Sequence, residues 1–480
     1  MKMARQKLAE PAKFQLNYEK GLLLGAWLLC TFHTLLAAFR YAIDLNAFQP
    51  YERWYTVLFA AAVLFYPILT KVKYPRTMYR IKSFFKGAKM PGQILLIGIF
   101  CWFLLGLVIR QKVDHIRYFK VGDWWIMDTV VLFFVVFPFC RYAGREKAKA
   151  AISWMFHIVI ACYSIFAYWC LWHVFHLNIL ELPGGGQIGL TRNLKLMLGC
   201  HYNLTGAISF SMILLALYMI FTQKLWVKIL YVIALLPNLY VALLSNSRTV
   251  YVSLLLVGFA GAFLAGWYLL TDKKKVIRLV LSGTAAIVCA GMIWWLRKEV
   301  FVWFDSVTGF TYKLAASGTA SSAGAGSAED AVRELTNLSG RIEVWRAAIK
   351  TMFSGPLEFF FGVTPFLVTS ALKELGGLTR DLAHAHNIIL QVGVSMGVPA
   401  MIAFIAFLIR IMLVCIRMYL KARGEQLKNY GIVPIIIAGL VLMNMAEAYL
   451  VAYFSVMACV FFIMTGLISS SEYGTGSLKQ

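Results

Sequence analysis

Long apolar runs follow one another along most of this chain, and they constrain its fold more than any other feature. Runs of roughly 17–25 apolar positions are long enough to cross the hydrocarbon core of a bilayer as helices. Lipid offers no hydrogen-bond partner to the backbone, so such runs must be helical. Of 480 residues, 60% are apolar and only 14% are charged. The sequence therefore predicts an all-α polytopic membrane protein.

Twelve transmembrane helices are expected, an even number that places both termini on the same side of the membrane. The expected spans lie near residues 21–39, 54–70, 92–109, 124–140, 150–173, 202–222, 226–244, 249–271, 276–296, 397–416, 430–447 and 449–469.

Lysine and arginine are unequally divided between the two sides that these spans define. The side with both termini holds 28 of the 46 basic residues but only six of the 22 acidic residues. Short basic loops stay in the cytoplasm, so both termini are expected there, with residues 1–20 preceding a retained signal anchor. Membrane orientation and contact with anionic headgroups thus explain the basic charge, and nucleic acid is not an expected partner.

The span pattern divides the chain into three parts. Residues 1–296 form nine helices, 297–385 form an extracytoplasmic loop, and 386–480 form the last three helices. Within the loop, apolar residues recur at near-helical spacing from 329 to 352, which predicts two amphipathic helices, the second capped by Ser339. The stretch from His386 to Gly397 is expected to lie at the interface or to re-enter the membrane.

Three polar residues fall at outer ends of these elements. Arg248 closes Ser-Asn-Ser-Arg between two spans, Arg341 lies in the external loop, and His386 lies where the next apolar run begins. An arginine at a span end commonly snorkels to headgroups, and Arg341 read alone is a solvated helix residue. Ser247 and Asn238, however, give Arg248 a polar setting, and a guanidinium matches phosphate oxygens in a bidentate way.

His386 is the expected general base, because imidazole is neutral near pH 7 and accepts a proton readily. His384 lies two residues earlier, so on a helix the two side chains would differ by about 200° and only one would face a site. The arginines are expected to disfavour protonation of His386. The nearest carboxylate along the chain is Asp381, and no metal site is expected.

Four motifs, in this order, resemble those of the O-antigen ligase and O-antigen polymerase superfamily. They are Asn203 to Gly206 (Asn-Leu-Thr-Gly), Ser245 to Arg248, Gly340-Arg341 with Trp345, and His386-Asn387 followed by Gly397 at the family's spacing. Ala400 departs from the pattern, since a second glycine is common there, and the stretch before Asn203 lacks the usual Arg-x-x-Gly.

The resemblance implies arginines that hold the diphosphate of an undecaprenyl-linked glycan and a histidine that activates the acceptor hydroxyl. By motif these roles fall to Arg248, Arg341 and His386, with no metal ion or other cofactor. Arg192 or Lys195 is a further candidate phosphate ligand. The remaining candidate substrate-binding residues are Asn203, Ser247, Trp345 and Asn387.

The leading prediction is a glycosyltransferase of the cytoplasmic membrane, acting on its outer face. Polymerase and ligase share these motifs, so both stay open. Its partners would be the lipid-linked donor, a glycan or lipid-glycan acceptor, a flippase and a chain-length protein. A transferase using Asp44 with polyprenyl-monophosphate sugars is one alternative. A transporter or flippase of a lipid-linked or anionic substrate is the other, with Asp128 as its deepest charge.

Overall fold

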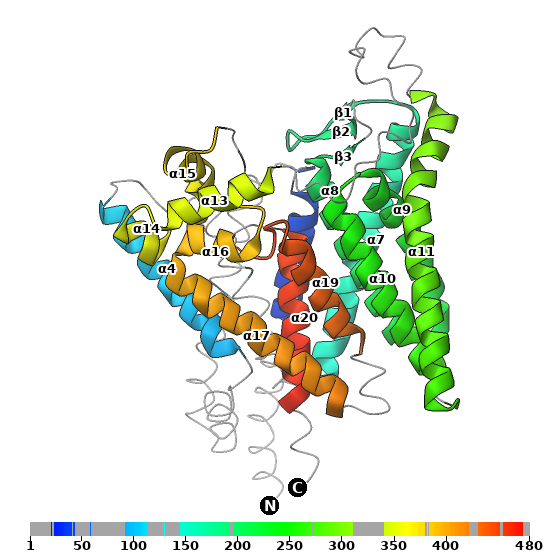
Figure 1. Cartoon of the computed structure of the whole chain (residues 1–480). Coiled ribbons are helices and arrows are strands. Elements are labelled where there is room, and N and C mark those ends of the chain that lie inside the picture. The colour runs from blue at the N-terminus through cyan, green and yellow to red at the C-terminus, as the bar shows by residue number, and fades with distance from the viewer. Residues whose placement is uncertain are drawn as a thin grey trace, which may run out of the picture.

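The computed structural model shows a helical bundle with shorter elements gathered at one of its ends (Figure 1). It describes residues 21, 24–40, 42–43, 58, 92–113, 129, 145–191, 195–270, 272–310, 340–379, 382, 384–421, 431–451 and 455–473.

Seven described helices are long and apolar enough to cross a membrane. They are α4 (Gln93–Val113), α7 (Arg145–Phe175), α8 (Tyr202–Thr222), α9 (Leu225–Leu244), α10 (Arg248–Leu269), α11 (Lys275–Thr308) and α17 (Val398–Lys421). Shorter apolar helices are Leu24–Phe39, α19 (Ile432–Asn444) and α20 (Val456–Tyr473). The chain is therefore a mostly helical, multi-pass membrane protein, as the apolar runs predict. The expected spans 54–70 and 124–140 fall almost entirely outside the described residues, and twelve crossings remain a prediction.

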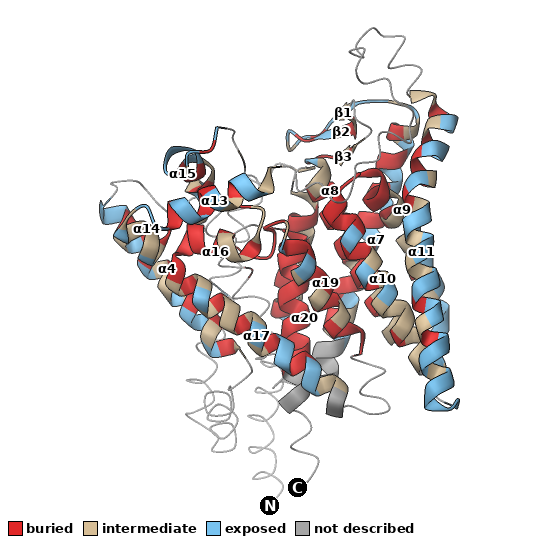
Figure 2. Ribbon diagram, viewed as in Figure 1, coloured by how far each residue is buried: buried red, intermediate tan, exposed pale blue. Residues whose placement is uncertain are grey.

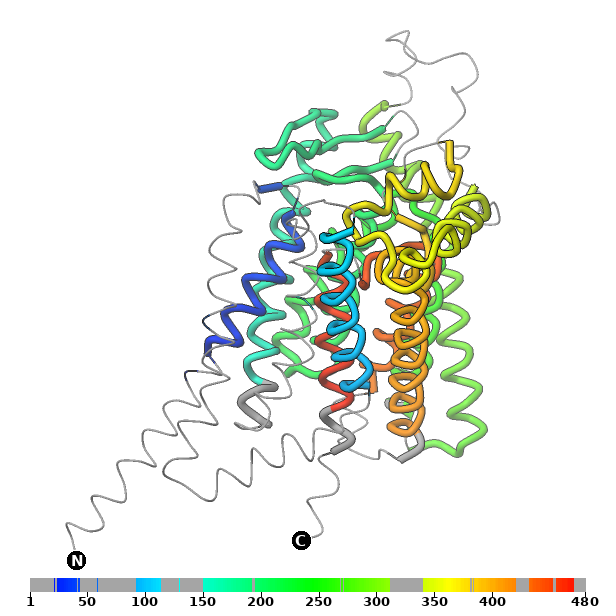
Figure 3. Tube along the Cα trace, turned by 90° about the vertical axis from the view of Figure 1, so that its left-hand side faces the viewer, coloured from blue at the N-terminus to red at the C-terminus, as the bar shows by residue number. Residues whose placement is uncertain are grey.

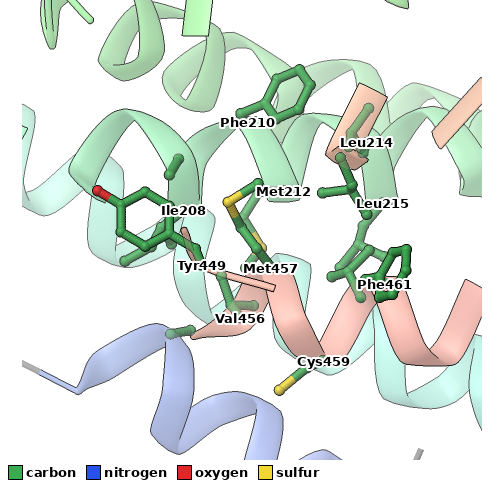
Figure 4. Packing of buried hydrophobic residues seen from close by; sticks show 14 of the residues in the cluster. Ile208, Phe210, Met212, Leu214, Leu215, Tyr449, Val456, Met457, Cys459 and Phe461 are labelled. Carbon is green, nitrogen blue, oxygen red and sulfur yellow. The ribbon is translucent and has the colours of Figure 1, made fainter. Parts of the chain in front are cut away.

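Helix α8 lies at the centre of the bundle. In the most apolar stretch of α8, 83% of the residues are buried, against 11% in the corresponding stretch of α11. Much of the surface of α11 is exposed (Figure 2). Residues Met212 and Leu215 of α8 pack beside Met457 and Phe461 of α20 (Figure 4). An apolar helix that leaves most of its surface uncovered, as α11 does, is suited to contact with lipid.

A small antiparallel sheet lies in segment 174–201, at the junction of α7 and α8, which the all-helical expectation missed. Its strands are β1 (Leu180–Glu181), β2 (Gln187–Leu190) and β3 (Leu196–Leu198), in the order β1-β2-β3. A Cβ on Gly186 would lie 1.9 Å from the carbonyl oxygen of Gly199, so only glycine allows this close approach. Strands of two to four residues are too short to show the alternation by which strands are recognised.

The end of the bundle that carries the sheet also carries five short elements (Figure 3). They are α13 (Arg341–Met352), α14 (Pro356–Phe361), the 3-10 helix η2 (Pro365–Leu367), α15 (Val368–Glu374) and α16 (Ile388–Met396). Val344, Ala348, Leu372 and Val394 are among the buried residues of the small apolar core that these elements share.

Helix α14 packs against α4 and bonds to two of its side chains. Arg110 of α4 forms an ion pair with Glu358 at 2.6 Å, and the indole of Trp102 donates to the Phe360 carbonyl at 2.8 Å. Gly397, at φ +89°, separates α16 from α17, and a Cβ there would lie 2.1 Å from the Phe360 oxygen. The region from His386 to Gly397 thus contains a short helix, α16, that precedes the long helix α17.

Two expected boundaries differ from the structure. Helix α11 continues unbroken to Thr308, so the boundary expected between 296 and 297 falls inside a helix. Helix α13 confirms the second amphipathic helix, but its N-cap is Gly340, at φ 74°, and not Ser339. Glycine adopts this left-handed conformation without the steric cost that serine carries.

Candidate active site

Glu447 is the residue at which the polar groups of several distant segments meet. It follows α19 in the non-helical stretch before α20, and its side chain is completely buried. Its Oε1 accepts a hydrogen bond from Arg341 Nη2 at 2.9 Å, and its Oε2 contacts His386 Nδ1 at 3.1 Å. One carboxylate therefore connects the start of α13 with the segment that precedes α16.

Arg341 also connects this carboxylate to α10. Its Nη2 donates to the hydroxyl of Thr249 at 2.9 Å, and Thr249 follows Arg248 in the first turn of α10. The structure thus brings together the segments that carry the three expected catalytic residues. Both Nη2 protons of Arg341 are used in these two contacts. The donors on its Nε and Nη1 remain outside them, on a side chain that is 15% exposed.

The backbone of His386 is held from both sides in a strained conformation. Its φ of 49° lies in the left-handed region, which costs a residue other than glycine on the order of 1–3 kcal/mol. Its N–H donates to His384 Nδ1 at 3.2 Å, and its carbonyl accepts from Trp345 Nε1 at 3.2 Å. Trp345, expected to contact substrate, thus also fixes the backbone of His386.

These contacts indicate which nitrogen of each histidine carries a proton. An ionised carboxylate accepts only, so His386 presents Nδ1–H to Glu447, and the lone pair of this tautomer lies on Nε2. His384 accepts at Nδ1, so its proton lies on Nε2, which is 3.7 Å from Glu447 Oε2. His386 therefore has the tautomer of a general base oriented by a carboxylate.

The expectation that only one of these histidines faces the site is wrong. Neither residue lies on a helix, since α16 begins at Ile388, so helical geometry does not separate their directions. Their ring centroids are 4.2 Å apart, and the His384 ring packs edge-on against Tyr449 at 5.2 Å. Both imidazoles therefore approach Glu447.

Burial and charge act in opposite directions on this cluster. Burial, followed by the charge of His386, lowers the pKa of His384 to about 3, although Glu447 acts to raise it. Burial alone would raise the pKa of Glu447. The hydrogen bond from His386 and the charges of both histidines and Arg341 outweigh it and lower the pKa to about 2. Neutral His384 and ionised Glu447 agree with the hydrogen-bond pattern.

Asn387 connects the segment that carries His386 with the segment that carries Glu447. Its Oδ1 caps α16 by accepting from the backbone N–H groups of Ile389 and Leu390, at 2.9 and 3.2 Å. Its Nδ2 donates to the carbonyl of Met445 at 3.1 Å, two residues before Glu447. Asn387, a candidate substrate ligand by motif, thus uses its amide to position the segment that carries Glu447.

The start of α10 is polar and buried. Ser245, Asn246 and Ser247 are at most 1% exposed, and Arg248 is 9% exposed. Ser247 is the N-cap of α10, yet its hydroxyl makes no capping bond and no hydrogen bond to any described residue. Asn238 belongs to a different environment, because its amide donates to Ser164 of α7 and to the Ala234 carbonyl.

The segment that contains the sheet, together with the start of α8, contributes groups beside the cluster. Lys195 Nζ lies 4.4 Å from the ring centroid of Tyr202, and the N–H of Asn203 donates to His201 Nδ1 at 3.4 Å. The charge of His201 is among the influences that lower the pKa of His384, so the start of α8 lies near the site. Arg192 lies outside the described residues, as do Asp44 and Asp128.

The cluster also has the composition of a metal site. Ligand atoms of His384, His386 and Glu447 lie within 4.8 Å of one another. The sequence argument against a metal considered only carboxylates near His386 along the chain, whereas Glu447 approaches His386 from a distant segment. The hydrogen bonds nonetheless favour a proton network: the His384 tautomer places a proton on its Nε2, and Arg341 occupies one oxygen of Glu447.

Comparison with protein families places this geometry in context. Residues 233–405, from α9 into α17, match the model of a family described as O-antigen ligase. This part of the chain is therefore similar to the O-antigen ligase family. The matched residues include Arg248, Arg341 and His386 and end before Glu447. A comparison with curated proteins finds no match.

Glu447 is the residue of this cluster that the sequence analysis does not single out. It lies at the end of the expected span 430–447, 61 positions from His386. A signal was present, because an acidic residue in an apolar run is costly and by default marks a functional site. The family match, which ends at residue 405, does not cover Glu447 either.

Proposed function

We propose that this protein is a glycosyltransferase that polymerises or ligates undecaprenyl-diphosphate-linked polysaccharide on the outer face of the cytoplasmic membrane. The family match supports transfer of a lipid-linked glycan. The observation that carries the proposal is the contact between His386 Nδ1 and the buried Glu447 carboxylate, inside a cluster that includes Arg341. This is the arrangement required for a base whose proton-accepting nitrogen is turned away from its carboxylate partner.

In the proposed reaction, His386 Nε2 accepts the proton of an acceptor hydroxyl as that oxygen attacks the anomeric carbon of the donor sugar. The bond between this carbon and the diphosphate oxygen breaks, and undecaprenyl diphosphate leaves with the electron pair. Glu447 stabilises the imidazolium that forms, because its negative charge lies against Nδ1–H. The proton then passes to solvent, which returns His386 to its starting state.

The leaving group gains negative charge, so its stabilisation needs cations more than a proton donor. Arg341 has donors beyond those that it gives to Thr249 and Glu447, and Arg248 begins the neighbouring helix. We assign both arginines to the diphosphate, together with the N-terminal end of α10, where backbone N–H groups favour anions. Ser247 offers a hydroxyl at the same place.

Transport is the alternative function for a multi-pass protein with a polar cluster. A transporter is expected to place ionisable groups near mid-span and to interrupt its helices there. Among the described residues, the cluster instead joins Glu447 to the starts of α10 and α13 and to the segment before α16, and these helices meet at one end of the bundle (Figure 1). This placement favours chemistry at a membrane surface.

The proposal is tested with purified protein in liposomes that contain a labelled undecaprenyl-diphosphate glycan. We expect new glycosidic bonds, release of one undecaprenyl diphosphate per bond, and unchanged activity in EDTA. Movement of label across the membrane without a new bond would support the transporter instead. Loss of activity in EDTA, with recovery on adding back a metal ion, would show that the histidine–glutamate cluster holds metal.

The side of the membrane is tested by cysteine labelling in intact cells, or in spheroplasts where an outer membrane is present. A cysteine introduced at Ser322 should react with an impermeant maleimide, and one introduced at Gly87 should not. Reaction at Gly87 alone would place the site in the cytoplasm and contradict the proposed location.

A further inference from the structure

The side chain of His384 contacts the backbone and the ring of His386, as well as Tyr449 and Glu447. Its Nδ1 accepts the backbone N–H of His386, its ring packs against both His386 and Tyr449, and its Nε2 points toward Glu447. The side chain is only 7% exposed. The segment from His384 to His386 thus forms a turn that is closed by a hydrogen bond, in which the side chain of His384 holds the backbone of His386.

This turn is needed because the conformation of His386 is unfavourable by itself. A positive φ is rare in residues other than glycine and persists only where the surroundings enforce it. The carbonyl of His386 is held by Trp345, and its N–H is held by His384. Without an acceptor at position 384, the His386 N–H loses this partner, and the positive φ that directs the imidazole to Glu447 is held only at the His386 carbonyl.

We infer that His384 is a positioning residue that keeps His386 in its catalytic orientation by accepting the His386 backbone N–H at Nδ1. This inference rests on the proposed function of His386 as base. His384 itself neither accepts the substrate proton nor contacts the reacting atoms. What it must supply is an acceptor atom bonded to Cγ, whereas the rest of its ring serves mainly to fill space beside Tyr449.

Three substitutions separate these properties. His384→Asn retains an acceptor on Cγ, because Oδ1 replaces Nδ1. His384→Phe retains the ring and its contact with Tyr449 but has no acceptor. His384→Gln places its polar atoms one bond further out, near the position of Nε2. His176, an exposed histidine at the end of α7, provides the matched control as His176→Asn.

The experiment measures glycan transfer by the reconstituted proteins, with kcat and KM determined separately. We expect His384→Asn to stay within about ten-fold of wild type and His384→Phe and His384→Gln to lose roughly a hundred-fold, mainly in kcat, since misplacing a catalytic group by about 1 Å costs that much. The control should match wild type. Equal activity of the Asn and Phe variants, or greater activity of Gln than Asn, would overturn the inference. Activity in His386→Ala would instead reject the proposed function.

Discussion

Two polar regions lie at the same end of the bundle, and they differ in how their buried groups are satisfied. Around Glu447, both carboxylate oxygens have donors, and the backbone of His386 is bonded at its N–H and its carbonyl. At the start of α10, the buried hydroxyl of Ser247 has no partner among the described residues. In the first region the carboxylate and the His386 backbone are thus fully paired, whereas the second contains a buried hydroxyl without a partner among the described residues.

The difference suggests two kinds of catalytic group, a proton acceptor that is oriented in advance and a site that binds an anion. A proton acceptor must be oriented before substrate arrives, so its hydrogen bonds lie within the protein. A site for an anion gains affinity when polar groups are satisfied only by the ligand, at a cost to the stability of the protein alone. We therefore expect substitutions in the Glu447 region to lower both activity and stability. Substitutions at Ser247 should lower activity without lowering stability.

The largest effect is expected at the base. His386→Ala removes the proton acceptor and should slow glycan transfer by roughly 10³- to 10⁴-fold, the upper part of the range for general base catalysis. Binding of the lipid-linked donor should remain. Radiolabelled transfer and donor binding, measured at equal protein level, check this result. A variant that transfers glycan at half the normal rate would reduce His386 to a structural residue.

Glu447→Gln should have the next largest effect, a loss of about 10²-fold in transfer. The amide of glutamine replaces one carboxylate oxygen with a donor, which then faces either His386 Nδ1–H or the Arg341 guanidinium. The same conflict should lower the free energy of unfolding by about 1–3 kcal/mol. Transfer rates and thermal unfolding in detergent measure the two effects. Full activity with an unchanged unfolding temperature would contradict the role given to Glu447.

The arginines are expected to contribute less individually. Arg248→Ala and Arg341→Ala should each lose a charge-assisted phosphate contact of about 1.5–3 kcal/mol, which corresponds to roughly ten- to hundred-fold in rate. Lysine should restore only part of the loss, because an ammonium does not form the bidentate pair. Glycan yield at equal expression is the measurement. Normal yield from both alanine variants would reject the diphosphate assignment.

A pH effect distinguishes the buried His384 from an exposed one. Its folded pKa, about 3, lies below the ordinary 6.5, so the unfolded chain binds a proton that the folded protein does not. The stability from this group is present above pH 6.5 and is lost as the pH falls toward 3. Wild type should therefore lose more stability over this interval than His384→Phe. Parallel unfolding curves for the two proteins would show that His384 is not buried in its neutral form.

The smallest effect on activity is expected at Ser247. Ser247→Ala should slow transfer by only about two- to ten-fold, the worth of one neutral hydrogen bond. It should leave the unfolding temperature unchanged or slightly higher, since it removes a buried hydroxyl that has no partner in the described part of the chain. A marked drop in unfolding temperature would mean that this hydroxyl is satisfied within the protein, and the contrast with the Glu447 region would fail.

The helices and the general place of the site could be predicted from the sequence, because both depend on local signals. Apolar runs identify the long helices, and short motifs point to Arg248, Arg341 and His386. Glu447 could not be paired with His386, since their contact depends on how distant segments pack. The closeness of the two histidines was also hidden, because it depends on a positive φ at His386 rather than on helical spacing.

The central claim, that Glu447 acts through His386, is tested most directly by a double-mutant cycle on single-turnover glycan transfer. The rates of wild type, His386→Ala, Glu447→Gln and the double variant are compared. If the carboxylate serves only to orient and stabilise the imidazole, the double variant should be no slower than His386→Ala alone. If the two losses multiply, Glu447 acts on the substrate independently, and the proposed proton network is wrong.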